Sequence, residues 1–272
     1  MFYKCHNLKV LPKINGNFQP YNLANMFNEC YSLREIPDDY FDEMDFSRMS
    51  SATSSYNHAA NSMFSMCKSL RKLPVSFFSG MNKVVDRSYC YFSSGWNGCT
   101  VLDELKDLPI PYTATWTGNA LYGTINNCMR LKRFTFALKE DGTPYTVQWK
   151  NQNLDFTLCV GWGNGVINEF VKYNSGITED KVVKDTETYE ALKNDDDWFA
   201  YSHHYSRYNR TSAVETINSL PDASAYLATA GGTNTIKFKG EAGSATDGGA
   251  INTMTEEEIA VATAKGWTVS FV

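Results

Sequence analysis

The sequence has no dense run of lysine and arginine and no long hydrophobic run. Its 25 basic residues are outnumbered by 30 acidic residues, which gives a formal net charge of −5 at pH 7. A mildly acidic chain without basic clusters is a poor candidate for binding a polyphosphate backbone. No apolar stretch approaches the roughly 20 residues that a membrane-spanning helix needs, and the opening Met-Phe-Tyr-Lys-Cys-His shows no signal peptide. We therefore expect neither a nucleic-acid partner nor a membrane span.

Motifs of catalytic and cofactor sites are also missing. The sequence contains no Gly-x-Ser-x-Gly, no phosphate-binding loop and no His-Glu-x-x-His. The glycine-rich segment 161–165 is not followed by the long helix that a dinucleotide-binding fingerprint requires. Carboxylates gather between Asp38 and Asp45, but they lie within a Pro-x-x-aromatic-Phe motif. That setting favours a solvated face over the paired carboxylates of a glycosidase. We expect a protein that is not an enzyme and that needs no cofactor.

Histidine is scarce, with four residues in the chain. His203 and His204 are adjacent, and adjacent side chains on a strand point to opposite faces. No third ligand has a suitable spacing, so a solvated polar loop is a better interpretation than a metal site. We expect no bound metal.

What the sequence does have is a repeat. Segments 1–12, 26–37 and 63–74 share the template Met-Phe-x-x-Cys-x-x-Leu-x-x-Φ-Pro, in which Φ is aliphatic. The template predicts a turn whose Phe and Cys point inward, followed by a short strand at Leu-x-x-Φ. Stacked copies then bury columns of like residues that one copy could not bury alone. The predicted column residues are Phe2, Cys5, Leu8, Phe27, Cys30, Leu33, Phe64, Cys67, Leu70, Cys99 and Cys128.

Two less regular copies follow. One leads from Tyr91-Phe92, through a short insertion that contains Trp96, to Cys99. The other leads from Leu121-Tyr122 to Cys128. The spacing between matched Met or Cys positions varies from about 25 to 37 residues, which is typical of an irregular solenoid with variable loops.

The Met-Phe-x-x-Cys-x-x-Leu pattern resembles the BspA-like leucine-rich repeats of bacterial surface proteins, some protist surface proteins and phage-encoded proteins. The resemblance covers about residues 1 to 136 by motif and departs from the family in its uneven period. It implies a β-rich solenoid used in attachment and recognition, and it implies no catalytic residues. The predicted fold class is an α+β repeat, an irregular leucine-rich-repeat solenoid with small helices toward the C-terminus.

We divide this predicted solenoid into three continuous parts. They are the repeats (1–139), an irregular repeat with a helical excursion (140–210), and the last repeats with a C-terminal cap (211–272). The middle part opens with a turn at Asp141-Gly142 and a strand-like run over 145–149. Its helical excursion is expected over 186–194, where the composition favours a helix.

The C-terminal part shows the same pattern twice, a capped helix followed by a strand. The two predicted capping boxes pair Ser212 with Glu215 and Thr255 with Glu258. Alternating residues predict a strand around Ile236 and another over 267–271, with Gly266 ending the second helix. This ending resembles a Thr-x-Glu-x-x-x-x-Ala-x-x-Lys-Gly-Trp terminus of repeat proteins in bacteria and their phages. Such a cap would close one end of a solenoid core.

The chain has seven cysteines, an odd number, and no Cys-x-x-Cys pair. Five of them hold the same repeat position, which predicts a column of small, buried, reduced side chains. Cys90 and Cys159 lie outside that predicted column, so a disulfide would involve one of these two.

Aromatic residues make up 14% of the chain. Nine of them fall in or next to predicted loops: Tyr40, Phe41, Phe77, Phe78, Tyr91, Trp96, Tyr112, Trp116 and Trp162. The candidates for binding are Trp96, Trp116, Trp162, Tyr91 and Tyr112. If they project from one edge of the stack, they form a platform for sugar rings or for a protein partner. The alternative is that they belong to the core.

We expect a non-catalytic, extracellular recognition or adhesion module of a phage virion or a bacterial cell surface. Its partner would be a host-surface glycan or protein, alongside other virion or surface subunits. The alternative is a scaffold that docks through its uncapped N-terminal repeat. Met1 stands inside a repeat motif without a cap, which favours lost or separately encoded upstream sequence over a natural start.

Overall fold

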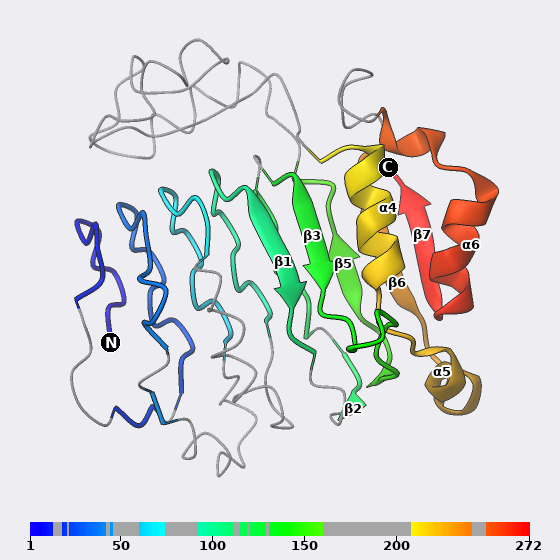
Figure 1. Ribbon diagram of the computed structural model, residues 1–272, viewed down its shortest axis with the longest axis horizontal. Coiled ribbons are helices and arrows are strands. Elements are labelled where there is room, and N and C mark those ends of the chain that lie inside the picture. The colour runs from blue at the N-terminus through cyan, green and yellow to red at the C-terminus, as the bar shows by residue number, and fades with distance from the viewer. Residues whose placement is uncertain are drawn as a thin grey trace.

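The computed structural model describes much of the repeat region and the C-terminal part (Figure 1). The described residues are 1–12, 18–20, 22–41, 44–45, 60–73, 92–110, 115–118, 120–128, 131–159, 208–240 and 249–272. Their strands and helices are β1 (Glu104–Leu108), β2 (Thr115–Trp116), β3 (Arg133–Phe136), β4 (Gln148–Trp149), β5 (Asn153–Asp155), α4 (Arg210–Ser219), α5 (Ser224–Ala230), β6 (Asn234–Phe238), the 3₁₀ helix η3 (Ile251–Thr253), α6 (Glu256–Ala264) and β7 (Trp267–Phe271).

All pairs between these strands are parallel. β1 pairs with β3, β2 pairs with β4, and β5, β6 and β7 form a three-stranded sheet. Parallel neighbours need a crossover connection between them, and Figure 1 shows the successive segments lying side by side from the N-terminus to the C-terminal helices. The Leu-x-x-Φ segments form strands at β1 and β3, whose register shifts between Leu105 and Leu108. In the first two copies the segment makes one parallel bridge, Val10 with Glu35, and a second bridge joins Phe18 with Met44.

Each copy bends through a tight turn, and we call the segment around that turn a rung. In the second rung, Cys30 N donates to Phe27 O at 3.0 Å, and Glu29 has a φ of 62°. The same bond joins the cysteine of every described rung to the residue three positions before it. We call that residue the rung centre, and the six centres are Phe2, Phe27, Phe64, Trp96, Ile125 and Phe156.

The residue two positions after the centre has a positive φ in the first five rungs. These residues are Lys4, Glu29, Met66, Gly98 and Asn127, with φ values from 59° to 75°. Only glycine adopts this left-handed conformation without a steric cost. Stacking of the rungs therefore stabilises a left-handed backbone conformation that these non-glycine residues disfavour on their own.

Backbone hydrogen bonds join neighbouring rungs in a fixed register. Phe2 N donates to Met26 O and Lys4 N donates to Asn28 O, both at 2.9 Å. The equivalent pair of bonds recurs from the second rung to the third, from the third to the fourth, and from the fourth to the fifth. Each rung thus donates from its centre and from the second residue after it.

The cysteine thiols add a side-chain bond to each interface. From the second rung on, each thiol donates to the backbone carbonyl of the preceding centre at 3.0 to 3.2 Å. These cysteines are Cys30, Cys67, Cys99, Cys128 and Cys159. Burial raises the pKa of the Cys30 thiol to about 11, and it also raises the pKa values of Cys67, Cys99 and Cys159 well above the usual range of a thiol. The buried thiols are therefore neutral at physiological pH and available as donors.

Rings and leucines form the other two columns of the core. The ring of Phe27 stacks between Phe2, at 5.7 Å, and Phe64, at 5.1 Å between centroids. Most predicted column residues are fully buried, namely Phe27, Cys30, Leu33, Phe64, Cys67, Leu70, Cys99 and Cys128. Phe2 and Leu8 are half-buried and Cys5 is exposed. The expectation that all five column cysteines are buried is wrong for Cys5, because no described residue covers the outer side of its rung.

The fourth rung differs from its predicted alignment. Trp96, which the sequence places in an insertion, is the rung centre, and Phe92 lies at the start of the preceding turn. The Trp96 ring stacks against Phe64 at 6.2 Å and against Phe92 at 5.7 Å. Cys159 also corrects an expectation, since it continues the cysteine column and is free rather than disulfide-bonded. Cys90 lies outside the described residues.

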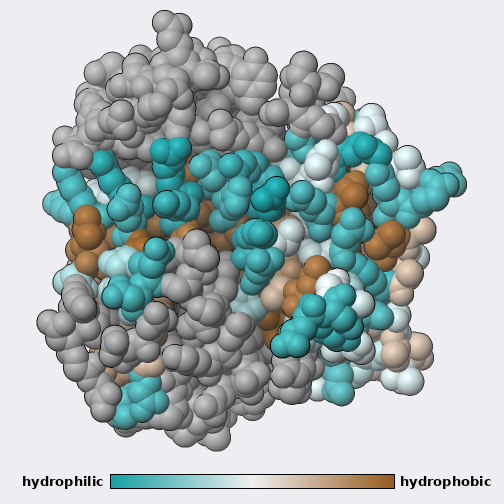
Figure 2. Space-filling model, in the orientation of Figure 1, coloured by the Kyte–Doolittle hydropathy of each residue, from teal (hydrophilic) through white to brown (hydrophobic). Residues whose placement is uncertain are grey.

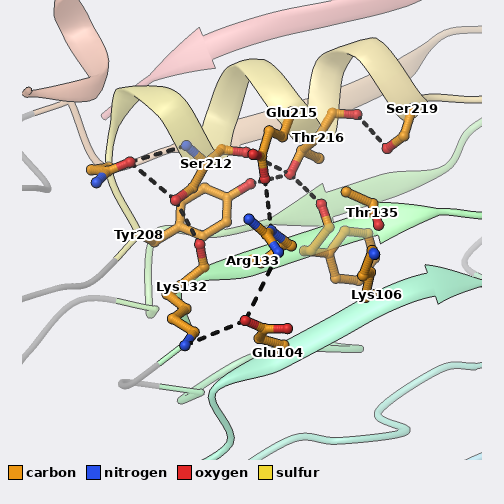
Figure 3. Close-up of polar contacts among 12 residues, drawn as sticks. Glu104, Lys106, Lys132, Arg133, Thr135, Tyr208, Ser212, Glu215, Thr216 and Ser219 are labelled. Atoms are coloured by element: carbon orange, nitrogen blue, oxygen red, sulfur yellow. Dashed lines mark hydrogen bonds and ion pairs between the residues drawn. The ribbon is translucent and has the colours of Figure 1, made fainter. Parts of the chain in front are cut away.

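Helix α4 covers the free edge of β3 with hydroxyl side chains (Figure 3). Ser212 Oγ donates to Lys132 O at 2.6 Å, and Thr216 Oγ1 donates to Phe134 O at 2.5 Å. Ser219 Oγ accepts from Phe136 N at 3.0 Å. The spacing of four and three residues places the three hydroxyls on one helix face. They satisfy edge groups of β3 that a further strand would otherwise pair.

This arrangement corrects the first predicted capping box. Asn209, not Ser212, is the N-cap of α4, and its side chain accepts from Ser212 N. Glu215 faces away from the cap and accepts from Arg133 Nε at 2.9 Å. The sequence pattern is misleading here because the Ser212 hydroxyl bonds to β3 instead.

The second predicted capping box is confirmed. Thr255 is the N-cap of α6, and Thr255 and Glu258 exchange both bonds of the box. Gly266 follows the helix with a φ of 81°, and β7 begins at Trp267. Lys265 joins the two helices by donating to the α4 carbonyls of Ile217, at 2.9 Å, and Asn218, at 2.6 Å.

The described residues of the middle part form a turn and two short strands. The predicted turn at Asp141-Gly142 is present, with Gly142 N donating to Lys139 O at 2.9 Å. The run over 145–149 contributes β4, and β5 precedes the rung centred on Phe156. The helix expected over 186–194 lies outside the described residues.

Candidate protein-binding site at the first rung

The structure buries two of the five aromatic residues of the predicted platform. Trp96 and Trp116 are 1% and 0% exposed. Trp96 belongs to the central ring column, and Trp116 stacks on Trp149 with 4.3 Å between ring centroids. The loop-like sequence around these residues hides their part in the stack. The other members of the predicted platform, Tyr91, Tyr112 and Trp162, lie outside the described residues.

The other sequence-derived candidates form no site in the part of the chain that the structure describes. No group of three or more His, Cys, Asp or Glu residues there could hold a metal ion. Asp38 and Asp39 are exposed, and Asp45 accepts from the Gln19 amide at 2.8 Å. His203 and His204 lie outside the described ranges. Among the described helices, none is long and apolar enough to cross a membrane.

Three of the eight exposed large apolar side chains among the described residues belong to the first rung, residues 1–10. Met1, Tyr3 and Val10 are 69%, 51% and 61% exposed. Figure 2 shows hydrophobic surface on the flank of the molecule where the N-terminal segment lies in Figure 1. Val10 holds the repeat position of Glu35 and Lys72, which are also exposed, whereas the equivalents of Tyr3 in the next two rungs, Asn28 and Ser65, are at least half-buried. Exposed apolar side chains such as Met1 and Tyr3 are typical of interaction sites when they lie together.

Backbone groups on this face lack the partners that their equivalents have elsewhere. The carbonyls of Met26 and Asn28 accept from the preceding rung, and the equivalent carbonyls in the first rung are those of Met1 and Tyr3. Within the described residues, no backbone N–H donates to either of them. The two carbonyls form an edge that can accept hydrogen bonds from another chain.

Cys5 lies beside these carbonyls at the outer end of the thiol column. Each described cysteine after it donates to the centre of a preceding rung, but for Cys5 the described chain supplies no such carbonyl. Its exposure distinguishes it from the five described cysteines that are buried. The thiol thus adds a donor to the open face.

A group of charged and aromatic residues links the first rung to the next two. Glu29 lies 3.6 Å from Lys4 Nζ and 3.8 Å from His6 Nε2, and it accepts from the Tyr31 hydroxyl at 3.0 Å. The His6 ring stacks on Tyr31 at 4.5 Å, and the Lys68 ammonium lies 4.8 Å from the Tyr31 ring centroid. Burial lowers the pKa of Lys68 to about 8. Lys4 and His6 thus contact Glu29 of the second rung, while about half of each side chain remains exposed.

Comparison with known proteins adds no relative to this picture: no protein-family model, no curated protein and no solved structure matches the chain. The candidate site therefore depends on the geometry of the first rung alone. Sequence reasoning pointed to this repeat through its missing cap, but it placed the binding aromatics elsewhere.

Proposed function

We propose that the chain is a BspA-like leucine-rich-repeat solenoid that acts as a non-catalytic binding module at a bacterial cell surface or on a phage virion. It docks a protein partner through its first rung. The register shared by the described rungs supports the repeat assignment, because the same turn, thiol bond and ring column recur along the chain. The resemblance to attachment proteins supports the extracellular role.

The observation that carries the docking proposal is the outer side of the first rung. It combines exposed Met1 and Tyr3 with two carbonyl acceptors whose equivalents in the second to fifth rungs are paired, and with a thiol whose equivalents in every later described rung donate to a neighbouring rung. An open backbone edge with apolar side chains suits a polypeptide that can add hydrogen bonds in register. The partner is therefore a protein, either on the host surface or in a neighbouring virion or surface subunit.

A glycan partner has weaker support from the described residues. Sugar rings bind to exposed aromatic faces, and two of the tryptophans considered for that role, Trp96 and Trp116, are buried. A glycan array therefore serves as the contrasting arm of the functional test.

The test compares matched pairs of surface substitutions in the intact protein. Tyr3→Glu with Val10→Glu charges the first rung, whereas Tyr122→Glu with Leu158→Glu charges exposed positions of other rungs, 55% and 43% exposed in the native chain. We expect binding to bacterial cells or virions to be lost in the first variant and kept in the second, with equal thermal unfolding of both. Binding that survives the first pair, or glycan binding that both variants share with the native chain, would contradict the proposal.

A further inference from the structure

We propose that Asn97 is a deamidation site that the contact between the fourth and fifth rungs protects, and that its conversion to isoaspartate opens the core at this place. The site is the Asn97-Gly98 pair in the turn of the fourth rung. Among the described residues, Asn97 is the only asparagine that is followed by a glycine. The inference is independent of the proposed docking function.

The reaction uses the backbone nitrogen of Gly98 as the nucleophile. Gly98 N loses its proton to water or hydroxide and attacks Asn97 Cγ. The new N–C bond forms while the Cγ–Nδ2 bond breaks, and the amide leaves as ammonia. Water then opens the resulting five-membered imide at one of its two carbonyls, which gives aspartate or isoaspartate. Glycine hinders the attack least of all residues, because it has no Cβ.

The repeat geometry explains why this reactive pair stands in the turn. Gly98 has a φ of 75°, which favours glycine, and an added Cβ would lie 2.5 Å from Met66 Sδ of the third rung. The residue directly after the rung centre is also an asparagine in the second and fifth rungs, at Asn28 and Asn126. The fourth rung therefore combines an amide side chain that the repeat often uses with a glycine that the turn favours.

Hydrogen bonds to the fifth rung hold both reacting groups apart. Gly98 N donates to Asn126 O at 2.8 Å, so the proton that must leave is engaged in the stack. Asn97 Oδ1 accepts from Asn127 Nδ2 at 3.3 Å, which directs the amide of Asn97 toward the fifth rung. The reaction requires these bonds to open, so its rate in the folded protein follows the population of the opened interface.

Conversion to isoaspartate disturbs the register on both sides of the fourth rung. Asn97 O accepts from Met66 N of the third rung at 2.6 Å, while Gly98 N donates to the fifth rung. In isoaspartate the chain runs through Cβ and Cγ, so an extra methylene enters the main chain and the former carbonyl becomes a free carboxylate. The two bonds can then no longer both form at the spacing of the rungs.

The thiol column on either side of this turn reports the disturbance. Cys99 follows the pair directly and donates to Phe64 O at 3.1 Å, and Cys128 of the fifth rung donates to Trp96 O at 3.1 Å. Both thiols are fully buried in the intact stack. We expect them to become accessible to a maleimide reagent once the fourth rung carries isoaspartate.

The first test compares the folded and the unfolded full-length chain. Both are incubated in the same mildly alkaline buffer, the second with guanidinium chloride, and peptide mapping by mass spectrometry follows aspartate and isoaspartate at Asn97. We expect the folded chain to react at least about tenfold more slowly, because opening of a packed interface is rare. Equal rates in the two states would overturn the proposal, and this comparison needs no variant.

A matched pair of variants tests the contact with the fifth rung. Asn127→Gly removes the amide that holds Asn97, and glycine freely adopts the φ of 62° at that place. Asn25→Gly is the control, because it makes the same change at another left-handed residue, whose side chain accepts from Asn28 Nδ2. We expect several-fold faster deamidation of Asn97 in the first variant and the native rate in the second. Equal rates in both variants would contradict protection by the fifth rung.

The last variant tests the consequence for the core. Asn97→Ser has no amide to lose, and Ser65 shows that serine fits this repeat position. We expect labelling of Cys99 and Cys128 to rise with the isoaspartate content of the native chain and to stay low in Asn97→Ser after the same incubation. Thiols that remain unreactive in the converted protein, or that open equally in Asn97→Ser, would overturn the opening of the core.

Discussion

Two regions of the described molecule, the C-terminal part and the first rung, differ in how their backbone groups are covered. Near the C-terminus, α4 supplies hydroxyls to the edge of β3, and Lys265 beyond α6 donates to the last carbonyls of α4. At the N-terminal end, no described element packs on the outer side of the first rung, and Cys5 is exposed. Backbone groups of the C-terminal part, which we call the closed region, are thus covered by polar side chains, whereas those of Met1 and Tyr3 have no described backbone donor.

The largest expected effect tests the closed region. Asn234 is fully buried, accepts from Gln152 N at 3.0 Å and donates to Trp149 O at 3.2 Å. Asn234→Leu leaves both backbone groups buried without a partner, so we expect a loss of about 3 kcal/mol in the free energy of unfolding. Urea denaturation measures it, and Asn218→Ala at an exposed α4 position is the control. A loss no greater than that of the control would show that these side-chain bonds contribute little.

A smaller effect compares the same repeat position in the two environments. Cys67→Ala removes a buried thiol and its bond to Phe27 O, which we expect to cost about 1 to 2 kcal/mol. Cys5→Ala removes an exposed thiol and should change stability by less than about 0.5 kcal/mol. Equal losses in the two variants, measured by chemical denaturation, would remove the distinction between the first rung and the interior.

The lowered pKa of Lys265, in the closed region, makes the stability of the protein depend on pH. Burial lowers the pKa of Lys265 in the folded protein to about 8, against an ordinary lysine value of 10.5. Between these values the unfolded chain binds more protons, so unfolding becomes less favourable as the pH rises from about 8 to 10.5. Because Lys265 is partly exposed, we expect a gain of only about 1 kcal/mol. Lys265→Met should flatten this rise, and an equally steep rise in that variant would assign it to other groups.

The smallest effect concerns the turns. Ser94 has a φ of 53° and glycine adopts that conformation without a Cβ clash, so Ser94→Gly should stabilise the protein by about 0.5 to 1 kcal/mol. Gly98→Ala is the opposite change, since its φ is 75° and an added Cβ would lie 2.5 Å from Met66 Sδ. We therefore expect Ser94→Gly to raise the melting temperature and Gly98→Ala to lower it. A lower melting temperature for Ser94→Gly together with a higher one for Gly98→Ala would contradict the turn geometry.

The sequence predicts the parts of the fold that depend on regular spacing. The shared template identifies the core positions of the second and third rungs, and the Thr255–Glu258 capping box identifies the start of α6. The fourth rung was misaligned because Trp96 replaces Phe and Gly95 replaces Met. The spacing Trp96-x-x-Cys99-x-x-Leu102 carries the signal that would have found it.

The C-terminal closure was harder to predict because its partners are distant in the sequence. The local sequence predicts that Ser212 is an N-cap, but its hydroxyl donates to Lys132 O, 80 residues away in the sequence. The first-rung site was predicted only as a missing cap. The Met1 and Tyr3 carbonyls and the Cys5 thiol are recognised as unpaired only by comparison with the later rungs, where the equivalent groups are hydrogen-bonded.

Thiol labelling of the native protein tests the open first rung most directly. A maleimide reagent is added under native conditions, and the modified cysteines are mapped by mass spectrometry at increasing times. We predict rapid modification of Cys5 and none of Cys30, Cys67, Cys99, Cys128 and Cys159 until the protein is denatured. Protection of Cys5 equal to that of Cys67 in the isolated chain, or native labelling of the buried cysteines as fast as Cys5, would contradict the open rung.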